Sequence, residues 1–425
     1  MGLFVAMFIT PEAIPGIPRQ ALKFRVSHRI EAVLRSGHPW LFDQSIQEQQ
    51  GEGPPGSLGV VFDHRNKFLA VGLYDPTSVI RLRILQARRP ATIDQAWFQE
   101  RLQEAFALRE PLLGTGTTGY RLVYGENDGL PGLVLDRYGD TLVLKLYSCC
   151  WIPHLYTVLK AIQELISLPR LVLRLSRGVQ QQTDHLYGLQ DGQVLYGEPL
   201  QAPVIFLENG LSFEAEVLKG QKTGFFLDQR DNRARVQALA KGKQVLNVFS
   251  FSGGFSVYAA CGEAKGVVSL DLSAHALASA VRNFLLNPKL AKVPHQCLQG
   301  DAFAQLANLK KQGQKFDLVI LDPPSFAQRA ADRLQALKAY KQLTALGAGV
   351  VNPKGILVSC SCSAHVSKED FEAAVESGLG KRSFSVIERT GHALDHPVRF
   401  KEGQYLKALF IQMDHEPLAR EKSYQ

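Results

Sequence analysis

The stretch that decides the fold is Q-V-L-N-V-F-S-F-S-G-G-F-S-V-Y-A-A-C-G-E-A-K-G-V-V-S-L-D, residues 244–271. Residues 245–249 form a short apolar run that predicts a buried parallel strand, and the polar, glycine-containing turn 250–254 follows it. Residues 255–260 carry apolar side chains at helical spacing, and a second apolar run at 267–270 ends on Asp271. The pattern predicts a β-α-β unit whose glycines let the backbone approach a ligand and whose acid accepts hydrogen bonds from a ribose. Because the third glycine of the dinucleotide fingerprint is missing, a purely structural turn remains the alternative on this stretch alone.

The pattern of alternating strands and helices continues on both sides of this unit. Strands are predicted at 204–207, 213–217, 297–298, 316–321 and 355–359, and helices at 231–240 and 273–287. Such alternation predicts an α/β fold with a doubly wound parallel sheet, in which ligands lie beyond the carboxyl ends of the strands. The unusual polar clusters at 250–254, 271, 301, 322–325 and 359–363 all fall at predicted strand ends. We therefore expect them to form one site.

The composition excludes several classes of protein. A chain of 425 residues with 45% hydrophobic and 21% charged residues is globular, and its length predicts about three domains. The net charge of +8 favours a polyanionic partner such as nucleic acid. Six cysteines without paired metal spacing favour a reducing compartment, and no apolar run approaches a membrane span. The sequence predicts a cytoplasmic location and no membrane partner.

The N-terminal third has a different pattern. Residues 1–22 are predicted to be a tail, and residues 23–93 a small β-rich domain with a helix at 28–36 and strands at 59–63, 68–74 and 80–85. This domain suits a phosphate backbone because of its arginines, which are Arg25, Arg29, Arg35, Arg65, Arg81 and Arg83. The alternative is a solvated basic face on a dimerisation or packing domain.

A second small module is predicted between this domain and the central unit. Residues 94–203 begin with a connecting helix at 93–109, continue with strands at 120–124, 133–136 and 142–147, and include a helix at 152–166. The polar turn 126–129 superficially resembles a metal loop, but it lacks the regular alternation of ligands. No metal site is predicted.

Four segments together resemble a known family. They are Q-K-T-G-F-F-L-D-Q-R at 221–230, F-S-F-S-G-G-F at 249–255, F-D-L-V-I-L-D-P-P-S-F at 316–326 and S-C-S at 361–363. In this order they are similar to the bacterial large-subunit ribosomal RNA cytosine-C5 methyltransferases, which use S-adenosylmethionine. The resemblance covers most of residues 23–413. It implies a PUA-like RNA-binding domain at 23–93, a central α/β domain at 94–203 and a Rossmann-like class I methyltransferase domain at 204–425.

The resemblance also implies the cofactor and the partner. Residues 249–254 would cradle the methionine part of S-adenosylmethionine, Asp271 would hold the ribose, Asp301 would lie by the adenine, and Asp322 would close the pocket near the methyl group. Ribosomal RNA would be the partner, and a homodimer is left open. The full set of implied cofactor contacts is Gln221, Asp228, Arg230, Phe249, Ser250, Ser252, Gly253, Gly254, Asp271, Asp301, Asp322 and Pro323.

Cytosine chemistry explains why a cysteine belongs in such a site. Carbon 5 of cytosine is a poor nucleophile, so a thiolate must first add to carbon 6. Cys362, just past a predicted strand end, matches the nucleophile of the family, with Asp322 as the second catalytic residue. Cys360 is interpreted as a packing residue. Pro324-Ser325-Phe326 carries no second cysteine, so the group that assists product release stays unidentified.

Two other functions remain open from the sequence. A ribosomal RNA guanine-N methyltransferase would share the cofactor pocket and the D-P-P-S-F segment but would need no nucleophilic thiol. A non-catalytic RNA-binding protein with a degenerate catalytic domain would not need Asp271, Asp322 or Cys362, and all three are present.

Overall fold

The computed structural model describes residues 21–220 and 222–414, together with Ile14 and Gly16. The predicted tail 1–22 therefore lies almost entirely outside the described residues. The chain divides into two compact units. One comprises the residues up to Leu211, Ala215–Leu227 and Leu394–Phe400. The other comprises Ser212–Glu214, Asp228–Ala393 and the residues from Lys401 on.

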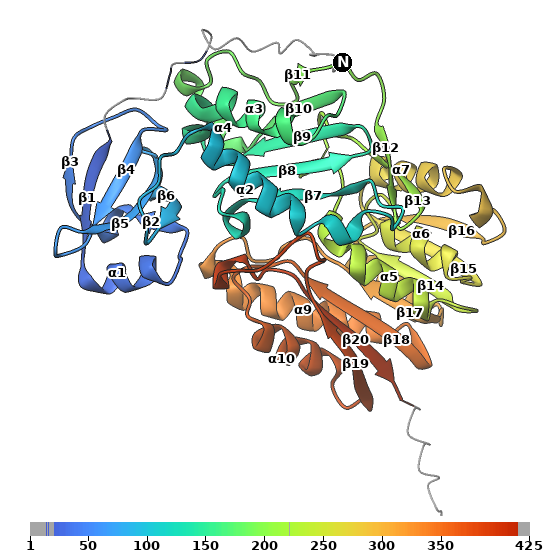
Figure 1. Cartoon of the computed structure of the whole chain (residues 1–425). Coiled ribbons are helices and arrows are strands. Elements are labelled where there is room, and N and C mark those ends of the chain that lie inside the picture. The colour runs from blue at the N-terminus through green and yellow to red at the C-terminus, as the bar shows by residue number, and fades with distance from the viewer. Residues whose placement is uncertain (1–13, 15, 17–20, 221, 415–425) are drawn as a thin grey trace, which may run out of the picture. The chain divides into compact units, whose positions relative to one another are not determined.

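The first unit begins with a six-stranded sheet in the order β2-β6-β5-β4-β1-β3 (Figure 1). Its elements are β1 (Leu22–Val26), α1 (His28–Arg35), β2 (Trp40–Phe42), β3 (Ile46–Gln50), β4 (Leu58–Phe62), β5 (Phe68–Tyr74) and β6 (Ile80–Ala87). β1 runs parallel to β4, and the other pairs are antiparallel. The strands expected at 59–63, 68–74 and 80–85 are present as β4, β5 and β6, and β4 ends at Phe62. The edge strand β3 was missed because four of its five residues, Q-E-Q-Q, are exposed and show no apolar alternation.

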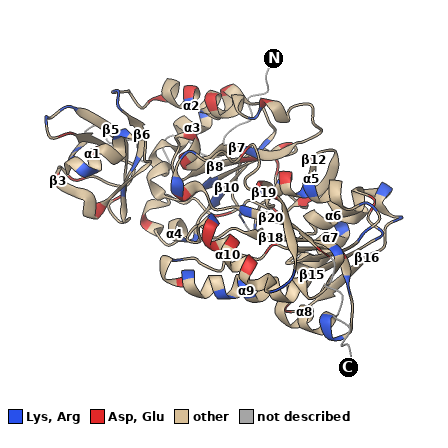
Figure 2. Ribbon diagram, turned by 90° about the horizontal axis from the view of Figure 1, so that it is seen from below, with Lys and Arg blue, Asp and Glu red and all other residues tan. Residues whose placement is uncertain are grey.

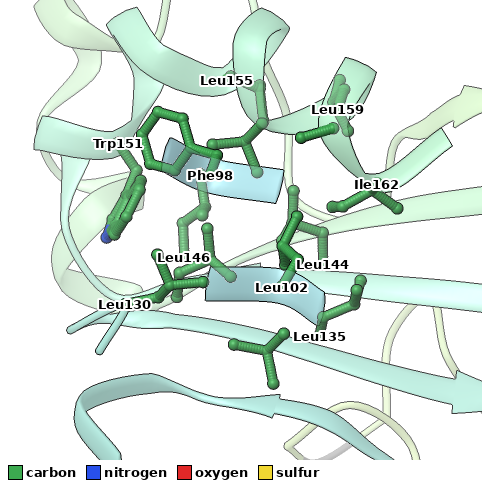
Figure 3. Close-up of a cluster of buried hydrophobic side chains, with 14 of the residues drawn as sticks. Phe98, Leu102, Leu130, Leu135, Leu144, Leu146, Trp151, Leu155, Leu159 and Ile162 are labelled. Atoms are coloured by element: carbon green, nitrogen blue, oxygen red, sulfur yellow. The ribbon is translucent and has the colours of Figure 1, made fainter. Parts of the chain in front are cut away.

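A five-stranded sheet in the order β11-β10-β9-β8-β7 follows in the same unit. Its strands are β7 (Gly119–Tyr124), β8 (Leu133–Tyr138), β9 (Thr141–Leu146), β10 (Arg170–Leu175) and β11 (Val194–Tyr196). The helices α2 (Gln95–Ala107) and α3 (Leu155–Leu165) pack against each other, and the short helix α4 (Arg177–Gln180) follows β10. Phe98 and Leu102 of α2 meet Leu159 of α3 and the strand residues Leu135 and Leu144 in one apolar core (Figure 3). This continuous core makes the sheet and its helices one packed body.

Two buried ion pairs support this sheet, one between connecting segments and one between the paired strands β7 and β8. Arg109 donates two hydrogen bonds to the carboxylate of Asp128, and Nη2 lies 2.7 Å from Oδ2. Arg121 holds Asp136 in the same bidentate manner, with Nε 2.7 Å from Oδ1. Because isolated buried charges are costly, each of these arginines and carboxylates depends on its partner.

The second unit is built on a seven-stranded sheet in the order β16-β15-β14-β17-β18-β20-β19. Its strands are β14 (Gln244–Val248), β15 (Gly266–Asp271), β16 (His295–Gln299), β17 (Phe316–Leu321), β18 (Val351–Ser361), β19 (Phe384–Thr390) and β20 (Lys407–Met413). The first five strands are parallel, as expected, whereas β20 runs antiparallel to both β18 and β19. A two-stranded sheet of β12 (Val204–Glu208) and β13 (Leu211–Ala215) precedes this sheet in the chain.

Helices cover both faces of the seven-stranded sheet. They are α5 (Arg230–Leu239), α6 (Gly254–Cys261), α7 (Ala274–Leu285), α8 (Ala302–Lys311), α9 (Arg333–Ala348) and α10 (Lys368–Leu379). α5, α6 and α7 form one layer, and α9 and α10 form the other (Figure 1). α8 packs against α9 in that second layer. The strand order reverses between β14 and β17, which is the point where ligands bind in open α/β sheets. Within the described residues, every helix is too short or too polar to span a lipid bilayer.

Candidate functional site

The turn after β14 has a strained backbone. Phe249 and Phe251 have φ of 59° and 47°, which is the left-handed region that residues with a Cβ rarely adopt, and Gly253 follows with φ of 77°. Three hydrogen bonds hold the turn: Ser250 N–H to the carbonyl of Leu270 at 2.9 Å, Gly253 N–H to the carbonyl of Ser250 at 2.8 Å, and Phe251 N–H to Asp271 Oδ2 at 2.8 Å. The turn is thus fixed at the carboxyl end of the central strands.

Gly253 is required by its surroundings as well as by its φ. A Cβ at this position would lie 2.7 Å from the Cβ of Ala280 on α7, which is closer than real Cβ contacts come. Gly253 is also the N-cap of α6, so the first amides of the helix and the turn face the same end of the sheet. A larger residue would displace α7 or open the turn.

Two serines place polar groups in this turn. Both side chains are about 95% buried. The Oγ of Ser250 has no hydrogen-bond partner among the residues that the structure describes. The carbonyl of Ser252 accepts a hydrogen bond from Asn283 at 2.8 Å. A buried hydroxyl without a partner is costly, and a polar ligand group in the turn would satisfy it.

Asp271 lies at the end of β15 and is held by two backbone amides. Oδ2 accepts from Phe251 as described, and Oδ1 accepts from the amide of Ser273 at 2.9 Å. Each carboxylate oxygen keeps a further lone pair, so the half-buried side chain can still accept from two vicinal hydroxyls. Its fixed orientation suits the ribose contact expected from the sequence.

Asp301 has a structural role that the sequence did not show. It is the N-cap of α8, and its Oδ1 accepts a hydrogen bond from the amide of Ala304 at 2.9 Å. The side chain is exposed, so its second oxygen remains accessible. Its position after β16 places it at the same edge of the sheet as Asp271, which ends the neighbouring strand.

The segment 221–230 contributes several polar groups. Gln221 lies outside the described residues. Asp228 is buried and accepts a hydrogen bond from the hydroxyl of Tyr405 at 2.5 Å, and the buried Arg230 donates from Nε to Asp231 at 3.1 Å. Gln229, which was not among the expected site residues, donates to Asp322 Oδ1 at 2.8 Å. Gln229 therefore orients the carboxylate that follows β17.

The thiol of Cys362 lies beside the D-P-P segment. Cys362 follows the last residue of β18, is half-buried, and its Sγ lies 3.8 Å from the carbonyl oxygen of Pro323. Cys360 is in β18 and fully buried. Burial raises the pKa of the Cys360 thiol well above its ordinary value, so this thiol stays protonated and is unreactive. The two cysteines thus have different environments.

A network of hydroxyls ties the two loops together. The hydroxyl of Tyr340 on α9 lies 2.9 Å from both Ser361 Oγ and Ser363 Oγ, and Ser363 Oγ lies 3.1 Å from Ser325 Oγ. The amide of Ala327 also donates to Ser363 Oγ. Burial raises the pKa of Tyr340 to about 12, so the phenol stays protonated. The network holds the S-C-S turn against the segment that follows β17.

A buried lysine lies next to the same turn. Lys407, the first residue of β20, has a relative exposure of 4%, and its Nζ donates to the carbonyls of Ser363 and Val366 at 2.7 Å each. Burial lowers the pKa of the amine to about 8, and the negative charge of an ionised Cys362 opposes that shift. No local pattern in the sequence indicates a role for this residue, because its partners come from a distant segment.

Two groups of side chains that resemble metal sites form hydrogen bonds and ion pairs within the protein. In the turn 126–129, Asp128 is paired with Arg109, and Glu126 accepts a hydrogen bond from Trp40 at 3.0 Å. His28, Glu31 and His64 bring ligand-type atoms within 4.8 Å of one another. Glu31 there accepts from both the amide and the ring of His64, and these hydrogen bonds lower its pKa against the opposing effect of burial. Arg35 lies 3.9 Å from Glu31, and its positive charge opposes a cation at this position.

Comparison with known proteins gives consistent matches. Residues 126–411 match the S-adenosylmethionine-dependent methyltransferase family, and residues 24–87 match a PUA-like domain. A ribosomal RNA large subunit methyltransferase of Deinococcus radiodurans is 51% identical over 407 residues, which is 94% of this chain and 99% of that protein. Ribosomal RNA large subunit methyltransferase I of Tolumonas auensis is 38% identical over 393 residues, covering 90% and 97% of the two chains.

Solved structures give the same fold. A methyltransferase from Streptococcus mutans superposes with a TM-score of 0.79 at 23% identity and covers 92% of this chain and 99% of its own. A methyltransferase solved in complex with S-adenosylhomocysteine (SAH) matches with the same TM-score and identity. These matches confirm the α/β fold class that the sequence predicts.

Proposed function

The chain belongs to the S-adenosylmethionine-dependent methyltransferase family, and from this premise we propose that it methylates carbon 5 of a cytosine in large-subunit ribosomal RNA. The relatives that span almost the whole chain are named for large-subunit ribosomal RNA, which supports the substrate class. One observation carries the choice of cytosine: a half-buried cysteine, Cys362, lies beside the carbonyl of Pro323 at the carboxyl end of the sheet.

The residues at the strand ends fit S-adenosylmethionine. The buried Ser250 hydroxyl, which lacks a partner within the described part of the chain, can bind a polar group of the ligand. Gly253 and the strained turn bring backbone close to it, and Asp271 keeps lone pairs for the two ribose hydroxyls. We assign Phe249, Ser252, Gly254 and Asp301 to the same cofactor pocket. When bound, the cofactor supplies an electrophilic methyl group on a sulfonium.

Cys362 would act as the nucleophile. Its thiolate adds to carbon 6 of the cytosine, and the electron pair displaced from the 5,6 double bond makes carbon 5 nucleophilic enough to take the methyl group. A base then removes the proton at carbon 5, the double bond re-forms, and the thiolate leaves carbon 6. The thiolate is thus regenerated, the proton stays on the base, and the net change at carbon 5 is the replacement of one hydrogen by a methyl group.

Asp322 would orient the base. Its carboxylate, held by Gln229 at 2.8 Å, can accept hydrogen bonds from the exocyclic amino group of cytosine. Pro323 and Pro324 stiffen the following backbone and remove two donors, so that carbonyls face the base. The target base must leave its stack to reach both the thiol and the methyl donor.

The PUA-like domain would anchor the RNA. Exposed basic residues lie on α1 and on the strands and turns around it, as Figure 2 shows with Lys and Arg in blue. These exposed residues are Lys23, Arg25, Arg29, Arg35, Arg65, Lys67, Arg88 and Arg89. Phosphate contacts of this kind position an RNA without selecting the methylated base.

A covalent trap tests the proposal. RNA that contains 5-fluorocytosine should form a stable adduct, because fluorine cannot leave carbon 5 as a proton. Cys362→Ser should lose both the adduct and methyl transfer, since a serine hydroxyl is barely ionised near neutral pH. Cys360→Ser is the matched control and should retain both. A Cys362→Ser variant that methylates RNA at the wild-type rate would show that guanine-N chemistry is the correct alternative.

A further inference from the structure

We propose that Lys407 is a positioning residue for Cys362, and that its buried ammonium both holds the turn that carries the thiol and stabilises the thiolate by its charge. The inference rests on the proposed function, because it takes Cys362 as the nucleophile. It adds a residue that lies outside all four sequence segments that point to the reaction.

The position of Lys407 follows from strand pairing. β20 is antiparallel to β18, and Lys407 is the register partner of Ser361, the last residue of β18. Cys362 is the next residue. The antiparallel direction of β20 is what brings the first residue of that strand to the carboxyl end of β18, where the parallel strands also end.

The hydrogen bonds of Lys407 bracket the turn. Nζ donates to the carbonyl of Ser363, one residue after the thiol, and to the carbonyl of Val366. Two short hydrogen bonds from one buried ammonium fix the start and the end of the turn 363–366 relative to each other.

The negative charge of Asp322 disfavours ionisation of the nearby Cys362 thiol. Burial is the main cause of the raised pKa of Tyr340 and Cys360, and the negative charges of Asp322 and of an ionised Cys362 raise both further. A negative carboxylate disfavours a thiolate in a half-buried place, and His365 in the same turn is exposed. The attraction between Lys407 and an ionised Cys362 offsets this.

The buried Lys407 amine carries a positive charge near neutral pH. A lysine that is 4% exposed incurs a desolvation penalty, which appears as the lowering of its pKa to about 8. Below that pH the amine is charged, and above it the charge is lost. The ammonium is therefore present over the neutral range in which the thiol must ionise.

Alkylation of Cys362 by iodoacetamide tests the inference on the full chain, without RNA or cofactor. The rate is followed against pH for each cysteine by peptide mass spectrometry. Lys407→Gln keeps N–H donors for the two carbonyls but has no charge, and it should raise the alkylation midpoint of Cys362 by about one pH unit, or lower its rate about tenfold near pH 7. Lys407→Arg keeps a cation and should stay close to the wild-type midpoint.

Two control measurements distinguish a specific effect on Cys362 from unfolding of the variant. Cys297 is exposed on β16, at the opposite edge of the sheet, and its profile should be the same in every variant. In the wild-type protein, the Cys362 midpoint should lie below that of the same cysteine in the urea-unfolded chain. A Lys407→Gln midpoint equal to wild type, or a wild-type midpoint no lower than in urea, would overturn the inference.

The outcome is separable from the test of the proposed function. If Lys407→Gln shifts the midpoint while Cys362→Ser still methylates RNA, the cytosine mechanism fails and the link between lysine and thiol stands. If Cys362→Ser is inactive but Lys407→Gln leaves the midpoint unchanged, the mechanism stands and the role of Lys407 is refuted.

Discussion

At the scale of single residues, the turn after β14 stores strain beside polar groups that a ligand can use. Phe249 and Phe251 adopt left-handed φ, which costs on the order of 1–3 kcal/mol for each such residue. The amide of Phe251 is held in that conformation by the carboxylate of Asp271. The carboxylate thus acts on the shape of the turn as well as on the expected ribose contact.

This double role makes Asp271 a sensitive test of the cofactor site. Asp271→Ala removes the acceptor for Phe251 and for the ribose, so we expect S-adenosylmethionine to bind at least about tenfold more weakly, in line with roughly 1.5–3 kcal/mol for hydrogen bonds to a charged group. Calorimetry measures the affinity directly. Glu376→Ala, an exposed acid on α10, is the control and should leave affinity unchanged. Equal affinity of Asp271→Ala and wild type would remove Asp271 from the site.

At the scale of elements, the Tyr340 hydroxyl joins α9 to the turn that carries Cys362. The Tyr340 phenol is the shared partner of Ser361 and Ser363, and it lies in the core beneath them. Ala336 and Leu343 of the same helix contribute apolar side chains to this core. The phenol therefore fixes the position of the turn relative to the helix.

Removing that hydroxyl should loosen the turn. Tyr340→Phe leaves the two serine hydroxyls with one partner fewer, and we expect the free energy of unfolding to fall by roughly 1–3 kcal/mol, the usual cost of a buried polar group that loses its partner. Urea denaturation measures the change. Tyr187→Phe, at an exposed position, is the control. A Tyr340→Phe protein as stable as wild type would show that water or another group replaces the phenol.

The sequence could predict features that depend on neighbouring residues, but not those that depend on pairing between distant strands. The strands expected at 245–249 and 316–321, the glycine turn and the acids at strand ends are local patterns, and the structure has them as β14, β17 and the turn after β14. Phe249 was expected in the strand, but it has a φ of 59° and lies in the turn. Lys407 begins the strand K-A-L-F-I-Q-M, in which a terminal lysine is usually solvated. Only the antiparallel pairing of β20 with β18 brings it to Cys362, and pairing between distant strands leaves no local signal.

The arginines of the N-terminal domain show the same limit. The sequence grouped six of them as a basic surface. The structure buries Arg83 with its Nη1 3.6 Å from Asp75, and it directs the half-buried Arg81 toward the backbone carbonyls of Asp75 and Pro76. These two cannot contribute fully to a phosphate-binding surface. Charge counts along a sequence therefore overestimate the positive surface, because ion pairs form between strands.

At the scale of the whole molecule, the net charge of +8 includes exposed basic residues and basic residues that are buried and paired with acids. Arg109, Arg121 and Arg174 are largely buried and paired with acids, so they stabilise the first unit and are not available to a polyanion. Arg29 and Arg65 are exposed, and neither forms an ion pair with any residue in the described ranges. These two arginines are therefore available to contact phosphates.

Salt dependence distinguishes such contacts from a generally basic surface. In the full-length double variant Arg29→Ala with Arg65→Ala, we expect weaker binding to ribosomal RNA and a shallower dependence of log affinity on log salt, by roughly 0.7 to 0.9 for each phosphate that the variant no longer neutralises. Filter binding over a range of salt concentrations measures both quantities. Affinity for S-adenosylmethionine should stay unchanged, because the turn after β14 and Asp271, which we propose to bind it, belong to the other unit. Lys241→Ala, an exposed charge of that unit paired with Glu263 at 2.9 Å, serves as the control and should leave the slope unaltered. An unchanged slope in the double variant would mean that the PUA-like domain does not bind the phosphate backbone through this face, and that the positive charge of the chain acts elsewhere.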